Sequence, residues 1–349
     1  MSDRLIIALD AMGGDEAPGI VVDGAAKALE LYPDADFHFY GSESVLTGLL
    51  DKKPALTARS SIRHTDQVIS PDEKPSTAVR RGRQSSMGLA VNAVRQGEAH
   101  VALSAGNTGA LMALAKVMLK TLPGIERPAL ASFIPTFRGD SIMLDLGANV
   151  DCDTENLVQF AIMGAAFART VLGLHTPSVG LLNIGQEELK GNDLVREAAE
   201  WLRRDDMAFD FVGYVEGDGI GQGQSDVIVS DGFTGNVALK TAEGTAKLVG
   251  RLLSDAFKAT FWSRLGYALA ARSLRSLKDH LDPNNHNGAV FLGLNGLVVK
   301  SHGGANAAGF ASAIGVAVDM ARADLCHLLA NDVARFKTQE DAETAVKAN

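Results

Sequence analysis

Cysteine is scarce in this sequence, and long apolar runs are absent from it. Its only two cysteines, Cys152 and Cys326, lie far apart, without a CxxC motif or a neighbouring pair of histidines. We therefore expect neither a disulfide framework nor a zinc site, and the pattern is typical of a reducing, cytoplasmic compartment. No stretch approaches the roughly 18 apolar residues that a membrane span requires. The apolar run in the first residues, MSDRLIIALDAMGG, is too short for a signal sequence, so any membrane contact is expected to be peripheral.

What the sequence does contain predicts a globular protein. Of its 349 residues 46% are hydrophobic and 21% are charged, which is enough to bury a large core without cross-links. The formal net charge of −9 disfavours nucleic acid as a partner of the surface as a whole. Local basic patches can still act over a screening length of about 10 Å.

Short runs rich in Ile, Leu and Val alternate with segments of helical periodicity along nearly the whole chain. This alternation is typical of parallel βα units whose strands are covered on both faces, so the sequence predicts an α/β fold. The predicted strands are LIIALD (5–10), DFHFYG (36–41), HVALSAG (100–106), SIMLDLG (141–147), SVGLLNIG (178–185), FDFVGYV (209–215), DVIVSDG (226–232) and GLVVKSHG (296–303).

No low-complexity linker and no internal repeat divides the chain. We expect a single domain over residues 1–335, built from two lobes between which the chain crosses. A polar tail follows at 336–349.

Six predicted strands end in a loop that combines glycine with small polar or acidic residues. Because ligands bind at the carboxyl ends of parallel strands, we expect these loops to form one polar cleft at one edge of the sheet. None of them fits a Walker A or GxGxxG fingerprint, and GDGIGQG at 217–223 is interpreted as a flexible loop. The six loops are DAMGGD (10–15), SAGNTG (104–109), DLGAN (145–149), NIGQEELKG (183–191), SDGFTGN (230–236) and KSHGG (300–304).

The loop SAGNTG precedes a helical segment that is apolar almost all round. Its glycines permit close backbone approach, and Ser104, Asn107 and Thr108 can cap the helix. The unpaired amides and the positive end of the helix dipole together suit an anion. Taken alone, the loop is better explained as a turn that only caps its own helix.

Three other loops carry polar groups that suit an anionic substrate. Lys190 lies between two glycines and would bind phosphate or remain solvated. Lys300 and His302 are two residues apart at a strand end, so they face the same side. His302 would donate to an oxyanion or a leaving group, or would be a capping or core histidine. Asp231 and Asn236 precede a helix as either caps or ligands.

Two segments are basic in this otherwise acidic chain. Residues 74–97 contain five cations and no acid, and a helix over 79–94 would place Arg83 on its apolar face, where it needs a carboxylate or an anionic ligand. Residues 251–280 contain six cations and two acids, and their apolar stripe breaks near 270–273. The break predicts two short amphipathic arms or one kinked helix, suited to a membrane surface, an acidic protein or a dimer seam.

In their order along the chain, these motifs resemble those of the bacterial phosphate acyltransferases of phospholipid synthesis, which make acyl phosphate from acyl-acyl carrier protein and inorganic phosphate. The resemblance runs from about Leu5 to about Leu329, and His100 departs from it where the family usually has an acidic residue. The motifs are DAMGGD, KPSTAVRRGRQSSM, SAGNTGALMA, RPALA, DLGANVDC, NIGQEELKGN, SDGFTGNVALKT and VVKSHG.

The resemblance implies a three-layer α/β/α fold with a mostly parallel sheet, like that of phosphotransacetylases and isocitrate-type dehydrogenases. It also implies a homodimer and a cytoplasmic enzyme that associates peripherally with the membrane, next to the membrane acyltransferase that consumes acyl phosphate. The basic amphipathic segment at about 255–282 is expected to protrude. We expect no cofactor, no nucleic acid and no metal, since no carboxylate cluster has ligand spacing.

The implied reaction needs an anion clamp and an oxyanion hole more than a catalytic base, because phosphate is a nucleophile at neutral pH and a thiol leaves readily. We expect direct attack on the thioester, with Lys190 and the amides of 104–109 holding phosphate and with His302 or Asn236 polarising the carbonyl. Binding of phosphate and thioester is further assigned to Asp10, Gly13, Gly14, Ser104, Gly106, Asn107, Thr108, Gly109, Asn149, Asn183, Asp231 and Lys300. Contact with the acidic carrier protein is assigned to Arg80, Arg81, Arg83, Arg264, Arg272 and Arg275.

Three alternatives remain open from the sequence. One is a phosphotransacetylase that uses acetyl- or acyl-coenzyme A, and another is a non-catalytic scaffold that binds carrier protein at the membrane. The third, a dehydrogenase, rests on fold analogy alone and lacks a nucleotide fingerprint.

Overall fold

The computed structural model describes residues 4–204, 207–282, 284–285 and 287–335, so the polar tail predicted at 336–349 lies outside the described residues. Its strands form one eleven-stranded sheet in the order β3-β2-β1-β4-β11-β10-β5-β6-β9-β7-β8. The strands are β1 (Leu5–Asp10), β2 (Ala35–Gly41), β3 (Ser60–His64), β4 (Val101–Ser104), β5 (Ala129–Thr136), β6 (Gly139–Leu144), β7 (Ser178–Leu182), β8 (Asp210–Val215), β9 (Val227–Val229), β10 (Ala289–Leu292) and β11 (Leu297–Lys300).

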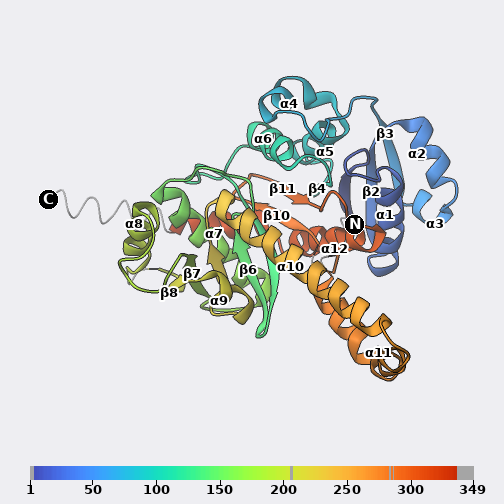
Figure 1. Cartoon of the computed structure of the whole chain (residues 1–349). Coiled ribbons are helices and arrows are strands. Elements are labelled where there is room, and N and C mark those ends of the chain that lie inside the picture. The colour runs from blue at the N-terminus through green and yellow to red at the C-terminus, as the bar shows by residue number, and fades with distance from the viewer. Residues whose placement is uncertain (1–3, 205–206, 283, 286, 336–349) are drawn as a thin grey trace.

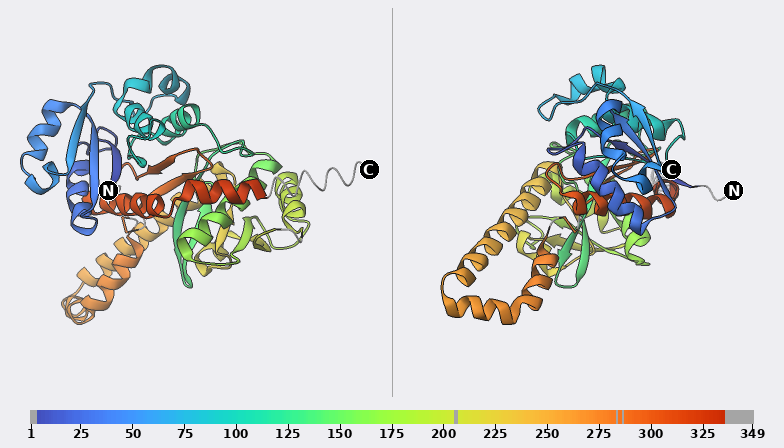
Figure 2. Two further views of the ribbon diagram at one scale, coloured as in Figure 1. Left: turned by 180° about the vertical axis from the view of Figure 1, so that it is seen from behind. Right: turned by 90° about the vertical axis from the view of Figure 1, so that its right-hand side faces the viewer.

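Helices cover both faces of this sheet (Figures 1 and 2). The helices are α1 (Gly19–Leu31), α2 (Glu43–Leu50), α3 (Pro54–Thr57), α4 (Pro75–Arg81), α5 (Ser86–Arg95), α6 (Thr108–Leu119), α7 (Thr154–Leu172), α8 (Asp193–Leu202), α9 (Gly217–Gln222), α10 (Gly232–Lys258), α11 (Phe261–Leu281) and α12 (Ala307–Arg322).

The core is divided by the sheet into two apolar layers. One layer packs α1, α2, α7, α8 and α12 against the strands, and the other packs α4, α5 and α6. Successive strand residues feed opposite layers, so Ile7 and Leu9 lie in the first and Ala8 in the second. The three-layer α/β/α arrangement expected for this chain is confirmed.

The two halves of the sheet run in opposite directions. β1, β2, β3, β4 and β11 are parallel to one another, and so are β6, β7, β8 and β9. β10 is antiparallel to β11 and to β5, and β5 is antiparallel to β6, so the second group points the other way. The prediction that six loops share one edge is therefore wrong, because β5 and β10, which are not among the predicted strands, reverse the direction of the second group.

The chain crosses between the two halves of the molecule. β1 to β4 belong to one half and β5 to β9 to the other, and after α10 and α11 the chain returns through β10 and β11 to the first half. α12 then packs against α1. The N-terminal and C-terminal parts of the fold are thereby held together.

The helix predicted over 79–94 is interrupted by a 3-10 turn at Gly82–Gln84. Ser85 is the N-cap of α5, and its hydroxyl accepts a hydrogen bond from the Gly88 amide at 3.1 Å. A Cβ on Gly88 would lie 2.8 Å from the Arg83 carbonyl oxygen, so glycine allows the turn to pack this closely. Arg83 is exposed and not on an apolar face, which makes that prediction wrong.

The interpretation of residues 217–223 as a flexible loop is also wrong. Residues Gly217–Gln222 form α9, which ends at Gly223 in the left-handed conformation with φ of 69°. Glycine adopts this conformation without strain, so Gly223 ends a short helix in a segment that was expected to be a loop.

α10 and α11 form an arm that projects from the body of the molecule (Figure 1). α10 begins in the body and runs outward, and α11 bends on its way back, which is the kinked-helix alternative (Figure 2). The segment predicted to protrude at about 255–282 is the outer part of this arm. The Arg275 side chain lies outside the described residues.

Candidate active site

A cavity of about 1930 Å³ lies where the two halves of the sheet meet. Its walls come from the loops after β1, β4 and β11 in the first half, and from β5, α9 and α10 in the second. The predicted site residues that line it are Gly13, Gly14, Gly106, Asn107, Thr108, Gly109, Asn236, Lys300 and His302. Loops distant in the sequence thus form one site.

Beneath the loops after β1 and β4 lies a buried polar contact. The Ser104 hydroxyl donates to Asp10 Oδ2 at 2.6 Å and accepts from the Gly106 amide at 3.0 Å. Asp10 is fully buried, which raises the pKa of its carboxyl, although the Ser104 hydrogen bond opposes the shift. A Cβ on Gly13 would collide with this carboxylate and come within 2.8 Å of the Gly106 amide nitrogen. Asp10 and Ser104 therefore fix the shape of the floor rather than lining the cavity.

Asn107 has the capping role that its loop predicted. Its Oδ1 accepts from the Ala110 amide at 3.0 Å, while its Nδ2 donates to the carbonyl oxygens of Pro71 and Glu73 at 2.8 and 3.0 Å. Both protons of its amide are thus occupied, whereas the first backbone amides of α6 have no intrahelical partners and can donate toward the cavity. An anion would therefore bind the backbone of this loop and not the Asn107 amide.

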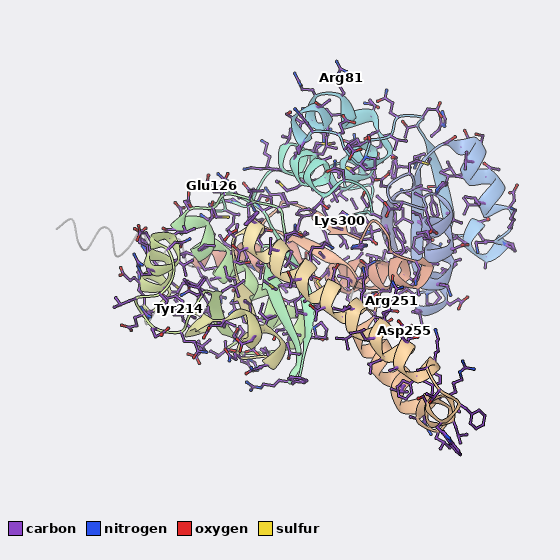
Figure 3. The ribbon with its side chains drawn as sticks, viewed as in Figure 1. Arg81, Glu126, Tyr214, Arg251, Asp255 and Lys300 are labelled. Atoms are coloured by element: carbon purple, nitrogen blue, oxygen red, sulfur yellow. The ribbon has the colours of Figure 1, made fainter. Side chains whose placement is uncertain are left out.

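Lys300 is a buried cation at the centre of the molecule (Figure 3). It is 8% exposed at the end of β11, and its ammonium donates to the Ser301 carbonyl oxygen. Burial lowers the pKa of Lys300 to about 8, while the nearby Asp10 opposes the shift. Near neutral pH it is still an ammonium, which an anionic ligand would stabilise.

His302 and Asn236 approach the cavity from opposite halves. The Gly304 amide donates to His302 Nδ1 at 3.1 Å, and the His302 Nε2 lies 3.3 Å from the Nζ of Lys240 on α10. Partial burial and the Lys240 ammonium both lower the pKa of His302. Asn236 lies one turn before Lys240, and its side-chain amide has no hydrogen-bond partner among the residues that the structure describes.

Two amide side chains and one carboxylate that were assigned to substrate binding form hydrogen bonds within the protein instead. Asn149 is buried and donates to Pro128 O and to Asp145 Oδ2, both at 2.8 Å. Asn183 donates to the carbonyl oxygens of Gly185 and Lys190 at 3.1 Å. Asp231 is the N-cap of α10 and accepts from the Thr234 amide at 2.8 Å. The structure places none of the three on the cavity wall.

Lys190 lies in the loop after β7, exposed and away from the cavity lining. The position of β7 in the sheet is the physical reason, because β5, β6 and β9 lie between it and β10, so the loop after β7 does not reach the cavity. The structure therefore does not bring Lys190 to the amides of 104–109.

The arginines assigned to the carrier protein fall into two groups. Arg80, Arg81 and Arg83 are exposed around α4, on the outer side of the molecule, where Figure 3 shows Arg81. Arg264 lines the part of the cavity formed by the arm, and Arg272 is exposed on α11.

The cavity continues from its polar end into an apolar region along the arm. This region is lined by side chains of β5 and by the inward faces of α10 and α11, among them Ile134, Leu253, Phe257, Tyr267 and Leu274. A ligand with a charged head and a long apolar tail would match both ends.

Neither a metal site nor a membrane span is found in the described residues. Over 4–204, 207–282, 284–285 and 287–335, no group of three His, Cys, Asp or Glu side chains has an arrangement that could hold a metal ion. No helix in the same part of the chain is long and apolar enough to cross a membrane.

Sequence reasoning missed Lys240. The signal was present in SDGFTGNVALK, because Lys240 lies four residues after Asn236 and so on the same face of a helix. Its significance depends on His302, which is 62 residues away in the sequence and reaches it only through the fold.

Comparison with known proteins places this chain in a family. The sequence matches the family described as "Fatty acid synthesis protein" over residues 5–328. The chain belongs to that family. It is 56% identical to a phosphate acyltransferase of Rhodospirillum centenum over 98% of this chain and 96% of the relative. It is 52% identical to one of Rhodospirillum rubrum over 97% of both chains. The resemblance to phosphate acyltransferases is thereby confirmed.

Solved structures agree on the fold. A phosphotransacetylase from Streptococcus pyogenes superposes with a TM-score of 0.59 at 19% identity, covering 93% of this chain and 95% of its own. The EutD phosphotransacetylase from Staphylococcus aureus gives a TM-score of 0.58 at 16% identity, covering 92% and 94%. At these identities the likeness shows the shared α/β fold alone.

Proposed function

We propose that this protein transfers a fatty acyl group from a thioester to inorganic phosphate and releases acyl phosphate and a thiol. The observation that carries the proposal is a single cavity with a cationic, amide-rich end at Lys300 and His302 and an apolar end along the arm. Its relatives at 52% and 56% identity are phosphate acyltransferases, which supports the same chemistry.

The geometry suits direct attack. The first amides of α6 and the Lys300 ammonium hold phosphate, so that one of its oxygens attacks the thioester carbon. The side-chain amide of Asn236 donates to the carbonyl oxygen as negative charge develops there. The carbon–sulfur bond then breaks, and the thiolate leaves without strong acid catalysis, since its ordinary pKa is about 8.5. Lys190 has no part in this arrangement.

The acyl donor, location and assembly are part of the same proposal. Exposed Arg80, Arg81 and Arg83 give an acidic carrier protein a basic surface to approach in a chain of net charge −9. The arm ends in the exposed Phe261 and Trp262, which suits peripheral contact with a membrane from the cytoplasm, beside an acyltransferase that consumes acyl phosphate. Exposed apolar side chains along α10 suit a homodimer.

A thiol-release assay tests the function. The purified protein is mixed with acyl-acyl carrier protein or acyl-coenzyme A, with and without inorganic phosphate, and both thiol and acyl phosphate are measured. We expect release that requires phosphate and is faster with the carrier donor. Faster release from coenzyme A would favour a phosphotransacetylase instead. Binding of carrier protein without any phosphate-dependent release would identify a scaffold.

A further inference from the structure

The His302 ring has a defined tautomer. The Gly304 amide donates to Nδ1, and a backbone N–H cannot change its role, so Nδ1 is an acceptor. A neutral imidazole then carries its proton on Nε2. The lowered pKa of His302 agrees with a neutral ring. His302 therefore presents an N–H donor to the cavity.

That donor faces another donor. Lys240 Nζ lies 3.3 Å from His302 Nε2, and an ammonium has protons only to give. The two groups cannot satisfy each other, so both need an acceptor between or beside them. Lys240 also donates to Glu243 Oε2 at 2.9 Å, one turn along α10, which uses only one of its three protons.

The two donors come from different halves of the molecule. His302 follows β11, whereas Lys240 is on α10, and both line the cavity together with Lys300. The charged groups that act on this point are the cations Lys240, Lys247 and Lys300 and the acids Asp10, Asp15 and Glu243. Of these groups three cations and two acids line the cavity, because Asp10 lies beneath its floor.

We propose that Lys240 is a phosphate-binding residue, whose ammonium and the Nε2–H of His302 bind the same inorganic phosphate ion across the cavity. The inference rests on the proposed function, and it assigns the position at which phosphate, the nucleophile of that reaction, binds. Phosphate suits the site because it offers oxygens on several sides to donors that approach from both halves. The carbonyl oxygen of a thioester, in contrast, presents one acceptor and is left to Asn236.

Steady-state kinetics of two opposing variants tests the proposal. Lys240→Met keeps the aliphatic stem but removes the ammonium, and a charge-assisted hydrogen bond of roughly 1.5 to 3 kcal/mol corresponds to about a 10- to 100-fold rise in KM for phosphate. The KM for the acyl donor should change less than about twofold. Glu243→Gln breaks the same ion pair while freeing Lys240, so its KM for phosphate should fall or stay the same.

Direct binding gives a readout independent of turnover. Titration calorimetry with inorganic phosphate, in the absence of acyl donor, should show the same loss of affinity in Lys240→Met and partial recovery in Lys240→Arg. Lys27→Met removes a cation from the exposed face of α1 and should bind phosphate like the unmodified protein. Because Lys240 is half-exposed and Lys27 is exposed, thermal unfolding should be nearly unchanged in the three lysine variants.

Three results would overturn the inference. The first is an unchanged KM and an unchanged affinity for phosphate in Lys240→Met. The second is a lower kcat with unchanged phosphate affinity, which would place Lys240 at the carbonyl. The third is an equal loss in Lys240→Met and Glu243→Gln, which would make the ion pair structural. Absence of phosphate-dependent release in the unmodified protein would instead contradict the proposed function, and the calorimetry would still decide on Lys240.

Discussion

At the residue scale, neighbouring side chains of the same loops have different tasks. The Asn107 side chain caps α6 and donates hydrogen bonds to the carbonyl oxygens of residues 71 and 73, whereas the backbone amides that follow it can bind a ligand. Asp10 accepts a hydrogen bond from Ser104 beneath the cavity, whereas the nearby Lys300 lines the cavity and can bind an anion there. Residue type alone does not show whether a polar side chain binds substrate or supports the site, because this depends on the hydrogen-bond partners that the fold gives it.

The pH dependence of turnover tests Lys300. Its pKa of about 8 means that the ammonium is present below pH 8 and is lost as the pH rises through that value. We therefore expect kcat/KM for phosphate to fall above pH 8. Lys300→Arg, which stays protonated, should lose this limb. Lys300→Met should be slower by about 100-fold or more below pH 8, and the difference should narrow above pH 8, where the unmodified protein loses the same charge. A flat profile in the unmodified protein would contradict the assignment.

Gly13 tests the close packing of the floor. Gly13→Ala places a Cβ against Asp10 and the Gly106 amide, so we expect both slower turnover and a loss of about 1 to 3 kcal/mol in the free energy of unfolding. Gly48→Ala in α2 is the matched control, because nothing lies within 4 Å of its Cβ. There the substitution should leave turnover unchanged and stabilise the protein by up to about 1 kcal/mol. Denaturant unfolding and thiol release measure the two effects.

At the scale of elements, the arm has an apolar surface that the other described residues leave exposed. Phe261 and Trp262 are 73% and 76% exposed at the start of α11, next to Arg264. Aromatic and basic side chains on one short helical stretch suit the boundary between lipid headgroups and acyl chains. The same arm lines the apolar end of the cavity, so under the proposed function the product would leave beside the membrane surface.

Vesicle flotation tests the contact between arm and lipid. Replacing Trp262 and Leu265 together by Gln should reduce the fraction of protein that floats with anionic vesicles, because two apolar side chains no longer enter the interface. Both side chains are exposed, so thermal unfolding should not change. Equal flotation of the two proteins would point to the other subunit or the carrier protein as the partner of the arm.

At the scale of the whole molecule, the basic face around α4 stands out against the net charge of −9. Reversing Arg80 and Arg81 to Glu should raise the KM for the acyl-carrier donor and leave the KM for phosphate unchanged, because α4 lies on the outer side, away from Lys300 (Figure 3). The KM for the carrier donor should also rise with salt in the unmodified protein and less so in the variant. Equal losses for both substrates would show damage to the cavity instead.

The sequence by itself determined the strand runs around most glycine loops, the α/β class and the capping of α6 by Asn107. These follow from local rules, since periodicity, caps and glycine turns involve residues close in the chain. The sequence also showed the family resemblance, because each motif is an unbroken run of residues that can be recognised without the fold.

Only the tertiary structure decided which loops share the cavity. β5, β6 and β9 lie between β7 and β10, so Lys190 and Asn183 after β7 do not line the cavity, whereas the return of the chain through β11 brings His302 to Lys240. Strand direction and contacts across 62 residues depend on how the whole sheet is assembled, and no local pattern encodes them.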